Sequence, residues 1–198
     1  MKYIHIIIFL MTTDLTKLKE YWQADLMKDK PFSWLRLFRR YIKGYMIRFK
    51  YLILWRLANE MFCCGSKKQK KCAKKINQHL IEKYNIEIAL GAHIGKQLNL
   101  THLSGIVISS YVNIGDNFTI KQNSTIGIKT LLESHGKSNS EYHITIGKNV
   151  FLGASSCIIG DNLNIGDNVK IGAMSYIDKN ISGNCTIITE KSNKIIYE

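Results

Sequence analysis

The sequence predicts a mainly β fold, a parallel β-helix preceded by an α-helical leader, and two patterns support this. From Ile88 onward an aliphatic residue recurs every six positions, and glycine often follows it; twelve of the fourteen glycines lie in this part of the chain. Residues before Tyr84 instead follow the 3.6-residue spacing of amphipathic helices. The chain therefore divides into a leader, 1–84, and a repeat domain, 85–198, which ends in a C-terminal tail.

The leader is predicted to be helical from Asp14 to about Tyr84. Between Trp34 and Tyr45 apolar residues lie at spacings of three and four, and arginines fill the other positions. Pro31 is suited to a helix start. A further helix is expected over 46–62, followed by a basic turn from Gly65 and a last helix. Charged residues interrupt every apolar run, so no membrane-spanning helix is expected.

The six-residue ladder is typical of a triangular coil with three short strands per turn. One aliphatic residue per side points inward, and Gly or Asn, as in "GDN" and "GKN", forms corners of positive φ. Coils stack about 4.8 Å apart, and the ladder predicts about five of them. Its fourteen members are Ile88, Ile94, Leu100, Ile106, Ile108, Ile114, Ile120, Ile126, Ile146, Leu152, Ile158, Ile165, Ile171 and Ile177.

Two interruptions of the ladder point to a functional face. The register slips by two residues at "GIVI", and a polar loop, 128–143, leaves the ladder after Ile126 and returns at Ile144. Repeat proteins place such insertions on the binding face.

The excess of positive charge is confined to the leader. Residues 1–84 hold 19 Lys/Arg and 6 Asp/Glu, whereas residues 85–198 hold nine of each. The leader could cap an exposed strand edge, rest on an anionic membrane, or bind nucleic acid. No nucleic-acid recognition motif is present, so nucleic acid is not an expected partner. Five cysteines without ligand spacing indicate a reducing cytoplasm rather than a disulfide framework or zinc ribbon.

Three segments carry a family resemblance: "THLSGIVIS", "EYHITIGKNVFLGASSCIIG" and "IGDNVKIGAMSYI". With the ladder they resemble the serine acetyltransferase branch of the left-handed β-helix acyltransferases, over residues 86–190. The leader is similar to the short helical leaders of colanic-acid and capsule acetyltransferases. The resemblance implies a left-handed coil, a homotrimer that could pair into a dimer of trimers, acetyl-CoA as co-substrate and no metal.

The resemblance also implies the site residues. His102 falls on the catalytic histidine, Glu87 on the acid that orients it, and His143 on a second histidine after the loop. Acetyl-CoA is expected to meet the backbone of Ala154 and Ala173, and Gly127 is assigned to the same binding site.

These roles fit the chemistry of acetyl transfer. An alcohol is a poor nucleophile, and free imidazole is mostly neutral at pH 7, so a histidine can take the hydroxyl proton. A regular 18-residue coil would place Tyr84 beneath His102, so Glu87 would have to reach sideways. Each residue has an alternative interpretation. His102 could be a surface histidine at a turn, Glu87 a solvated carboxylate, and His143 a histidine at the end of the loop. Cys157 is read as a packed or surface thiol rather than a nucleophile.

Three departures from the family pattern bear on the acceptor. Thr101 and Tyr142 replace an Asp and an Arg that help to hold serine, and Ile128 replaces a glycine. The expected function is therefore acetyl-CoA-dependent O-acetylation of a sugar hydroxyl in a surface polysaccharide or its precursor, in the cytoplasm or peripherally on the inner face of the membrane. The alternatives are serine O-acetylation in cysteine biosynthesis and a non-catalytic trimeric scaffold.

Overall fold

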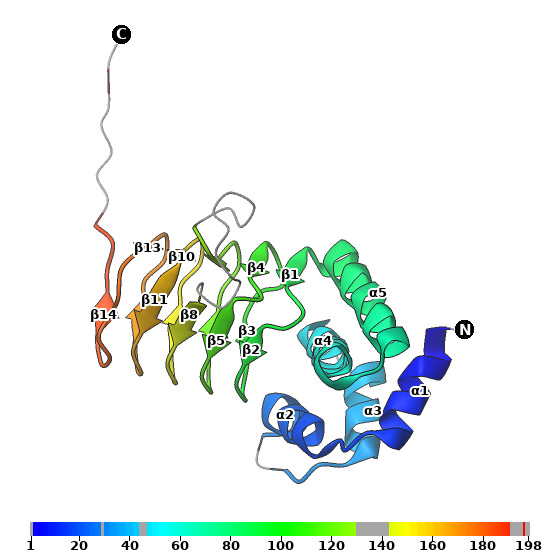
Figure 1. Cartoon of the computed structure of the whole chain (residues 1–198). Coiled ribbons are helices and arrows are strands. Elements are labelled where there is room, and N and C mark those ends of the chain that lie inside the picture. The colour runs from blue at the N-terminus through cyan, green and yellow to red at the C-terminus, as the bar shows by residue number, and fades with distance from the viewer. Residues whose placement is uncertain (1, 29, 44–46, 130–142, 191–195, 197–198) are drawn as a thin grey trace.

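The structure, a computed structural model, describes residues 2–28, 30–43, 47–129, 143–190 and 196. Helices gather at one end of a stack of coils, and the last strand lies at the far end (Figure 1). The described helices are α1 (Lys2–Thr12), α2 (Thr16–Leu26), α3 (Trp34–Lys43), α4 (Ile47–Cys64) and α5 (Lys67–Tyr84). Among the described residues, no helix has both the length and the apolar content to cross a membrane.

The strands form three parallel sheets that make the three sides of a prism. The first sheet has the order β1-β4-β7-β10-β13, the second β11-β8-β5-β2, and the third β14-β12-β9-β6-β3. Their bounds are β1 (Ile86–Ile88), β2 (His93–Ile94), β3 (Asn99–Leu100), β4 (Ile106–Ile108), β5 (Val112–Ile114), β6 (Thr119–Ile120), β7 (Thr125–Gly127), β8 (His143–Ile146), β9 (Phe151–Leu152), β10 (Cys157–Ile159), β11 (Asn162–Ile165), β12 (Lys170–Ile171), β13 (Tyr176–Ile177) and β14 (Thr186–Ile187). In the last coil Ile181 makes only an isolated bridge to Ile165. The parallel β-helix predicted from the six-residue ladder is confirmed.

The ladder residues form the core of the prism. All fourteen predicted positions are buried, none more than 5% exposed. Most small or branched residues four positions later are buried as well, whereas Ser104 and Ser110 are exposed. Ser104 belongs to the same turn as His102, which is where the regular coil is interrupted.

One edge of the prism is built from stacked asparagines. Asn117, Asn149, Asn168 and Asn184 all have φ between 57° and 58°. The side-chain amide of each of the first three donates to Oδ1 of the asparagine in the following coil, at 2.9, 2.9 and 2.8 Å in order. Asparagine tolerates this left-handed conformation better than most residues, which explains the repeated "GDN" and "GKN" segments.

Helix α4 closes the open end of the first coil. Trp55 Nε1 donates to the carbonyl oxygen of Ile88 at 3.0 Å. Arg56 donates to the carbonyl oxygens of Ile94 and Gly95, both at 2.6 Å. Because these carbonyls have no further coil beneath them, the helix satisfies acceptors that a strand edge would otherwise expose.

The leader differs from the sequence prediction at two helices. Helix α1 precedes the predicted helical region, and its Phe9 is fully buried. The predicted basic turn after Gly65 is instead the start of α5. Ser66 and Gln69 form a capping box, in which the Ser66 N–H donates to Gln69 Oε1 at 2.7 Å, so the helix begins at Lys67. Whether the chain divides into domains after residue 84 stays a prediction.

Candidate functional site

The turn that carries His102 is longer than the turn that stacks on it. Leu100 pairs with Ile120, twenty residues later, whereas Val107 pairs with Thr125, eighteen residues later. Two extra residues therefore lie between Leu100 and Val107, as the slip at "GIVI" predicts. The turn closes locally, with the Ser104 N–H donating to the His102 carbonyl oxygen at 3.1 Å. His102 is exposed in this enlarged turn.

Four turns stack along one edge of the prism, which we call the His102 edge: residues 101–105, 121–124, 153–156 and 172–175. Backbone hydrogen bonds join each turn to the next. The donors are the N–H groups of Asn123, Ser155 and Met174, and the acceptors are the carbonyls of Ser104, Gln122 and Ala154, at 2.9, 3.0 and 2.8 Å respectively. His102 therefore lies at the leader end of a column that continues through Ala154 and Ala173.

Buried serines fix the inner side of this edge. Ser124 Oγ donates to the carbonyl oxygen of Gly153 at 2.9 Å, and Ser156 Oγ donates to that of Gly172 at 2.8 Å. Both serines are fully buried. Because these bonds hold the start of each turn, the outward-facing backbone of the next residue, Ala154 or Ala173, is kept in a fixed position.

The amides of Ala154 and Ala173 donate no hydrogen bond within the described part of the chain. The equivalent amides at the asparagine edge do have partners: the N–H groups of Lys96 and Lys148 each donate at 2.7 Å to an aspartate of the following coil, Asp116 and Asp167. The His102 edge lacks such an aspartate. It therefore offers backbone N–H groups that can donate hydrogen bonds to the carbonyl oxygens of a ligand.

Glu87 lies at the exposed centre of β1, level with Val107. The prediction that Tyr84 lies beneath His102 is wrong, because the Gly105 N–H donates to the Asn85 carbonyl oxygen at 2.8 Å and the first coil is twenty residues long. No hydrogen bond joins the Glu87 and His102 side chains in the described residues. Burial raises the pKa of the Tyr51 hydroxyl, and the charge of Glu87 adds to that rise.

His143 and Gly127 lie on a different edge of the prism, which we call the His143 edge, between the sheets of β7 and β8. His143 is exposed at the start of β8, and its N–H donates to the Asp161 carbonyl oxygen at 2.8 Å. In the coil before it, the seven residues from Gly105 to Tyr111 cross from the His102 edge to this one, roughly 20 Å of extended chain. One chain therefore does not bring His102 and His143 together, nor Gly127 together with Ala154 and Ala173.

Comparisons with known proteins agree with this architecture. Residues 143–179 match the family described as hexapeptide repeat of succinyl-transferase. A serine acetyltransferase of Staphylococcus epidermidis is 41% identical over 103 residues, 52% of this chain and 45% of that protein. Another, from Staphylococcus xylosus, is 35% identical over 132 residues, 67% and 56% of the two chains. The crystal structure of Entamoeba histolytica serine acetyltransferase 1 in complex with L-cysteine superimposes with a TM-score of 0.69 at 26% identity, over 95% of this chain and 67% of that one.

The chain is similar to the hexapeptide-repeat acyltransferases. Within that family its relatives are serine acetyltransferases, and the left-handed coil predicted from the resemblance is the fold that it shares with them. The chain spans about half the length of the curated relatives it matches. The resemblance of the leader to those of colanic-acid and capsule enzymes stays a prediction.

The structure adds Gln122, a residue that the sequence pattern did not single out. Gln122 occupies the position on the His102 edge that follows His102 in the column. Its Oε1 atom is buried and has no hydrogen-bond partner among the described residues. A side chain between ladder positions 120 and 126 gives no periodic signal, so only the stacking of coils identifies it.

His93 takes no part in either edge. His93 is exposed on the sheet of β2, with Nδ1 2.7 Å from Asn113 Oδ1. Tyr142, one of the departures from the family pattern, lies outside the described residues. The described ranges contain no group of three His, Cys, Asp or Glu side chains that could hold a metal ion.

Proposed function

We propose that this chain is an acetyl-CoA-dependent O-acetyltransferase whose site lies on the His102 edge. One observation carries the proposal: an exposed histidine lies at the end of a column of turns in which the amides of Ala154 and Ala173 donate to no group among the described residues. The column places a base and backbone donors along the same edge. The names of the relatives support the same reaction class.

The reaction needs a base and donors for a thioester arm. His102 takes the proton of the acceptor hydroxyl while the hydroxyl oxygen attacks the thioester carbonyl carbon. The carbon–sulfur bond then breaks, and the departing CoA sulfur receives the proton from the imidazolium. A base of this kind contributes about 10²–10⁴-fold to the rate. The N–H groups of Ala154 and Ala173 bind carbonyl oxygens of the CoA arm.

Glu87 is proposed to orient and stabilise the imidazolium of His102. Glu87 lies in β1, the strand that the first coil contributes to the first sheet, and the same coil ends in the His102 turn. His143 and Gly127 lie on the other edge. We therefore assign them to the site that the His102 edge of a neighbouring copy forms. In a trimer, the His102 edge of one copy would face the His143 edge of the next.

L-serine is the first candidate acceptor. The curated relatives that match this chain are serine acetyltransferases, whereas no comparison supports the polysaccharide acceptor expected from the sequence. The names of the relatives therefore favour the alternative over the sequence-based expectation.

A sugar hydroxyl is the second candidate, and Thr101 is the residue that favours it. Thr101 stands directly before His102 with no charge, so it offers no partner for the ammonium group of a free amino acid. A neutral polyol has no such group to satisfy.

A cytoplasmic location also stays a prediction, from the cysteine pattern.

An assay of CoA release compares the two acceptors on the full chain. Acetyl-CoA is supplied with L-serine or with bacterial oligosaccharides, and kcat/KM is measured for each. Turnover with serine supports the first candidate, and turnover with an oligosaccharide alone supports the second. If CoA is released with neither, or equally fast without an acceptor, the proposed transferase activity is wrong.

A further inference from the structure

Helix α3 exposes large apolar side chains on one side. Leu37 is the one buried residue among its side chains that the structure describes. At 100° per residue the exposed apolar residues share one arc of the helix, and the arginines occupy another. Trp34, Leu35, Phe38, Tyr41 and Ile42 are between 40% and 60% exposed.

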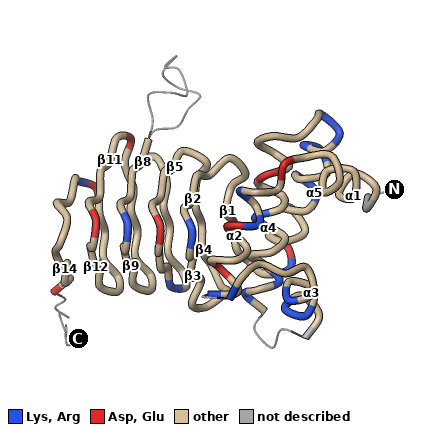
Figure 2. The backbone as a smooth tube through the Cα atoms, turned by 90° about the horizontal axis from the view of Figure 1, so that it is seen from below, with Lys and Arg blue, Asp and Glu red and all other residues tan. Residues whose placement is uncertain are grey.

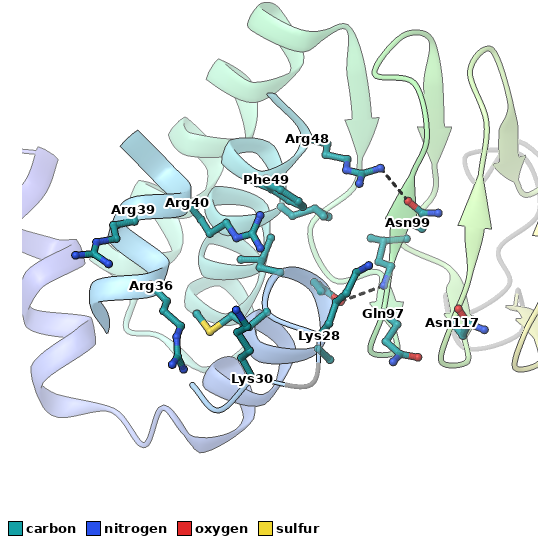
Figure 3. A pocket seen from close by; sticks show the side chains of 16 residues that line it. Lys28, Lys30, Arg36, Arg39, Arg40, Arg48, Phe49, Gln97, Asn99 and Asn117 are labelled. Atoms are coloured by element: carbon teal, nitrogen blue, oxygen red, sulfur yellow. Dashed lines mark hydrogen bonds between the residues drawn. The ribbon is translucent and has the colours of Figure 1, made fainter. Parts of the chain in front are cut away.

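A basic groove of about 1260 Å³ lies beside this helix, between α2, α3, α4 and the first two coils. Figure 3 shows lysines and arginines on the helical side of the groove and Gln97, Asn99 and Asn117 on the side of the coils. The cations that line it are Lys28, Lys30, Arg36, Arg39, Arg40 and Arg48. Figure 2 shows the same imbalance over the molecule, because basic residues concentrate on the helical half and the coils carry both signs.

The positive charge of the groove is not neutralised by the described carboxylates. Asp25, the acidic residue that lines it, is buried and paired with Arg56 at 2.8 Å. Arg40 and Arg48 lie over the Phe49 ring, with their guanidinium carbons 4.8 and 5.2 Å from its centroid. These contacts orient the two guanidinium groups and leave their charge available to an anion.

We propose that α3 and the basic groove form a docking surface for an anionic lipid bilayer. A helix with Trp, Phe and Leu on one face and Arg on another lies in the plane of a membrane interface. The apolar side chains of α3 would enter the boundary between headgroups and acyl chains. Headgroup phosphates would enter the groove and meet its six cations.

Charge and apolarity together select this partner over two others. A second copy of the chain meeting the first across a twofold axis at α3 would bring two positive grooves together, which like-charge repulsion opposes. A soluble polyanion would match the groove but would leave the apolar arc of α3 in water. An anionic bilayer accommodates both features.

Tryptophan fluorescence of the full chain tests the proposal directly. Of the three tryptophans, Trp22 and Trp55 are at most 1% exposed, whereas Trp34 is 49% exposed on α3. Vesicles of equal parts phosphatidylglycerol and phosphatidylcholine should therefore shift the emission of Trp34 to shorter wavelength and sediment with the protein. Vesicles of phosphatidylcholine alone should bind much more weakly.

Matched variants locate the surface. Each neutralised cation near a charged membrane costs roughly fivefold in partition, so Arg36→Gln, Arg39→Gln and Arg40→Gln together should weaken binding roughly a hundredfold. The control combines Lys68→Gln, Lys71→Gln and Lys75→Gln on α5, which removes the same charge from exposed residues outside the groove. Phe38→Ser tests the apolar face and should also weaken binding, with unchanged CoA release.

Several results would overturn the proposal. One is the absence of binding to anionic vesicles; another is an equal loss in the two triple variants, which would mean that overall charge alone drives the association. Binding of heparin without vesicles would assign the groove to a soluble polyanion. A Phe38→Ser protein that forms a smaller oligomer but still binds vesicles would assign the helix face to a second copy. None of these results depends on whether the protein transfers acetyl groups.

Discussion

His102 is exposed because its turn contains two more residues than the turn that stacks on it. In the shorter turns the residue four positions after the ladder position, such as Ser124 or Ser156, is buried inside the edge. In the longer turn the corresponding Ser104 is exposed, and so is His102. An imidazole in this position can reach a substrate, whereas a ladder position would bury it.

Replacing Glu87 by glutamine tests its proposed role as a positioning residue. The amide keeps the size of the side chain but removes the charge that would stabilise the imidazolium, so kcat should fall roughly tenfold or more with little change in KM for acetyl-CoA. Steady-state CoA release measures both constants. Equal kcat values for Glu87→Gln and the parent would leave Glu87 as a solvated carboxylate, the alternative that the sequence also allowed.

Single residues were predictable wherever they follow the period. The fourteen ladder residues needed only the six-residue spacing, since each aliphatic side chain must point inward. Tyr84 was misplaced because its prediction assumed a coil of 18 residues, and the first coil has twenty. Gln122 was missed because its importance depends on which turns stack, and that follows from register rather than from local sequence.

At the scale of elements, one buried ion pair joins α2 to α4 and holds the two side chains that bind the backbone of the first coil. Arg56 Nε lies 2.8 Å from Asp25 Oδ2, and both side chains are almost fully buried. Asp25 Oδ1 also accepts the Leu98 N–H at 3.0 Å. Burial raises the pKa of Asp25 from its ordinary value, and the adjacent Arg56 opposes that rise. This network connects α2, α4 and the first coil.

Asp25→Ala should destabilise the protein strongly. The substitution leaves the buried Arg56 guanidinium without its counter-ion, and breaking such a pair costs about 3–5 kcal/mol of unfolding free energy. Urea unfolding gives the change. Glu20→Ala is the control, since it breaks the exposed Glu20–Lys96 pair and should shift the midpoint far less. Equal shifts in the two variants would show that the buried pair does not hold the leader on the coils.

Strands were more predictable than helix ends. The sequence located the change from helix to strand, because the apolar period changes there from 3.6 to six. It assigned the lysines after Gly65 to a turn, because their charge obscured the Ser66–Gln69 capping box that starts α5. Helix α1 was not predicted, and burial of Phe9 shows that packing within the leader stabilises it.

At the scale of the molecule, the three-sided prism separates the proposed site residues. His102, Ala154 and Ala173 lie on one edge, and His143 and Gly127 lie on another. A site that uses both histidines therefore needs two chains. The sequence could suggest the residues through the resemblance, but the separation of the edges required the stacking of complete coils. The basic groove likewise combines three helices with two coils, which no linear pattern reveals.

Co-expression of two inactive variants tests the shared site. His102→Ala and His143→Ala should each lose activity alone, whereas random assembly of equal amounts of the two into trimers should restore about a quarter of the sites, those with an intact residue from each neighbour. Activity per protein measures the recovery, and His102→Ala co-expressed with the double variant provides the control. No recovery in mixed assemblies would contradict a site formed between chains.

The most direct test of the proposed activity is the rate of CoA release by His102→Ala with the accepted alcohol. If the exposed imidazole is the base, the rate falls about 10²–10⁴-fold, while acetyl-CoA binds as tightly as to the parent because the amides of Ala154 and Ala173 remain. A variant that releases CoA as fast as the parent would contradict the catalytic role of His102.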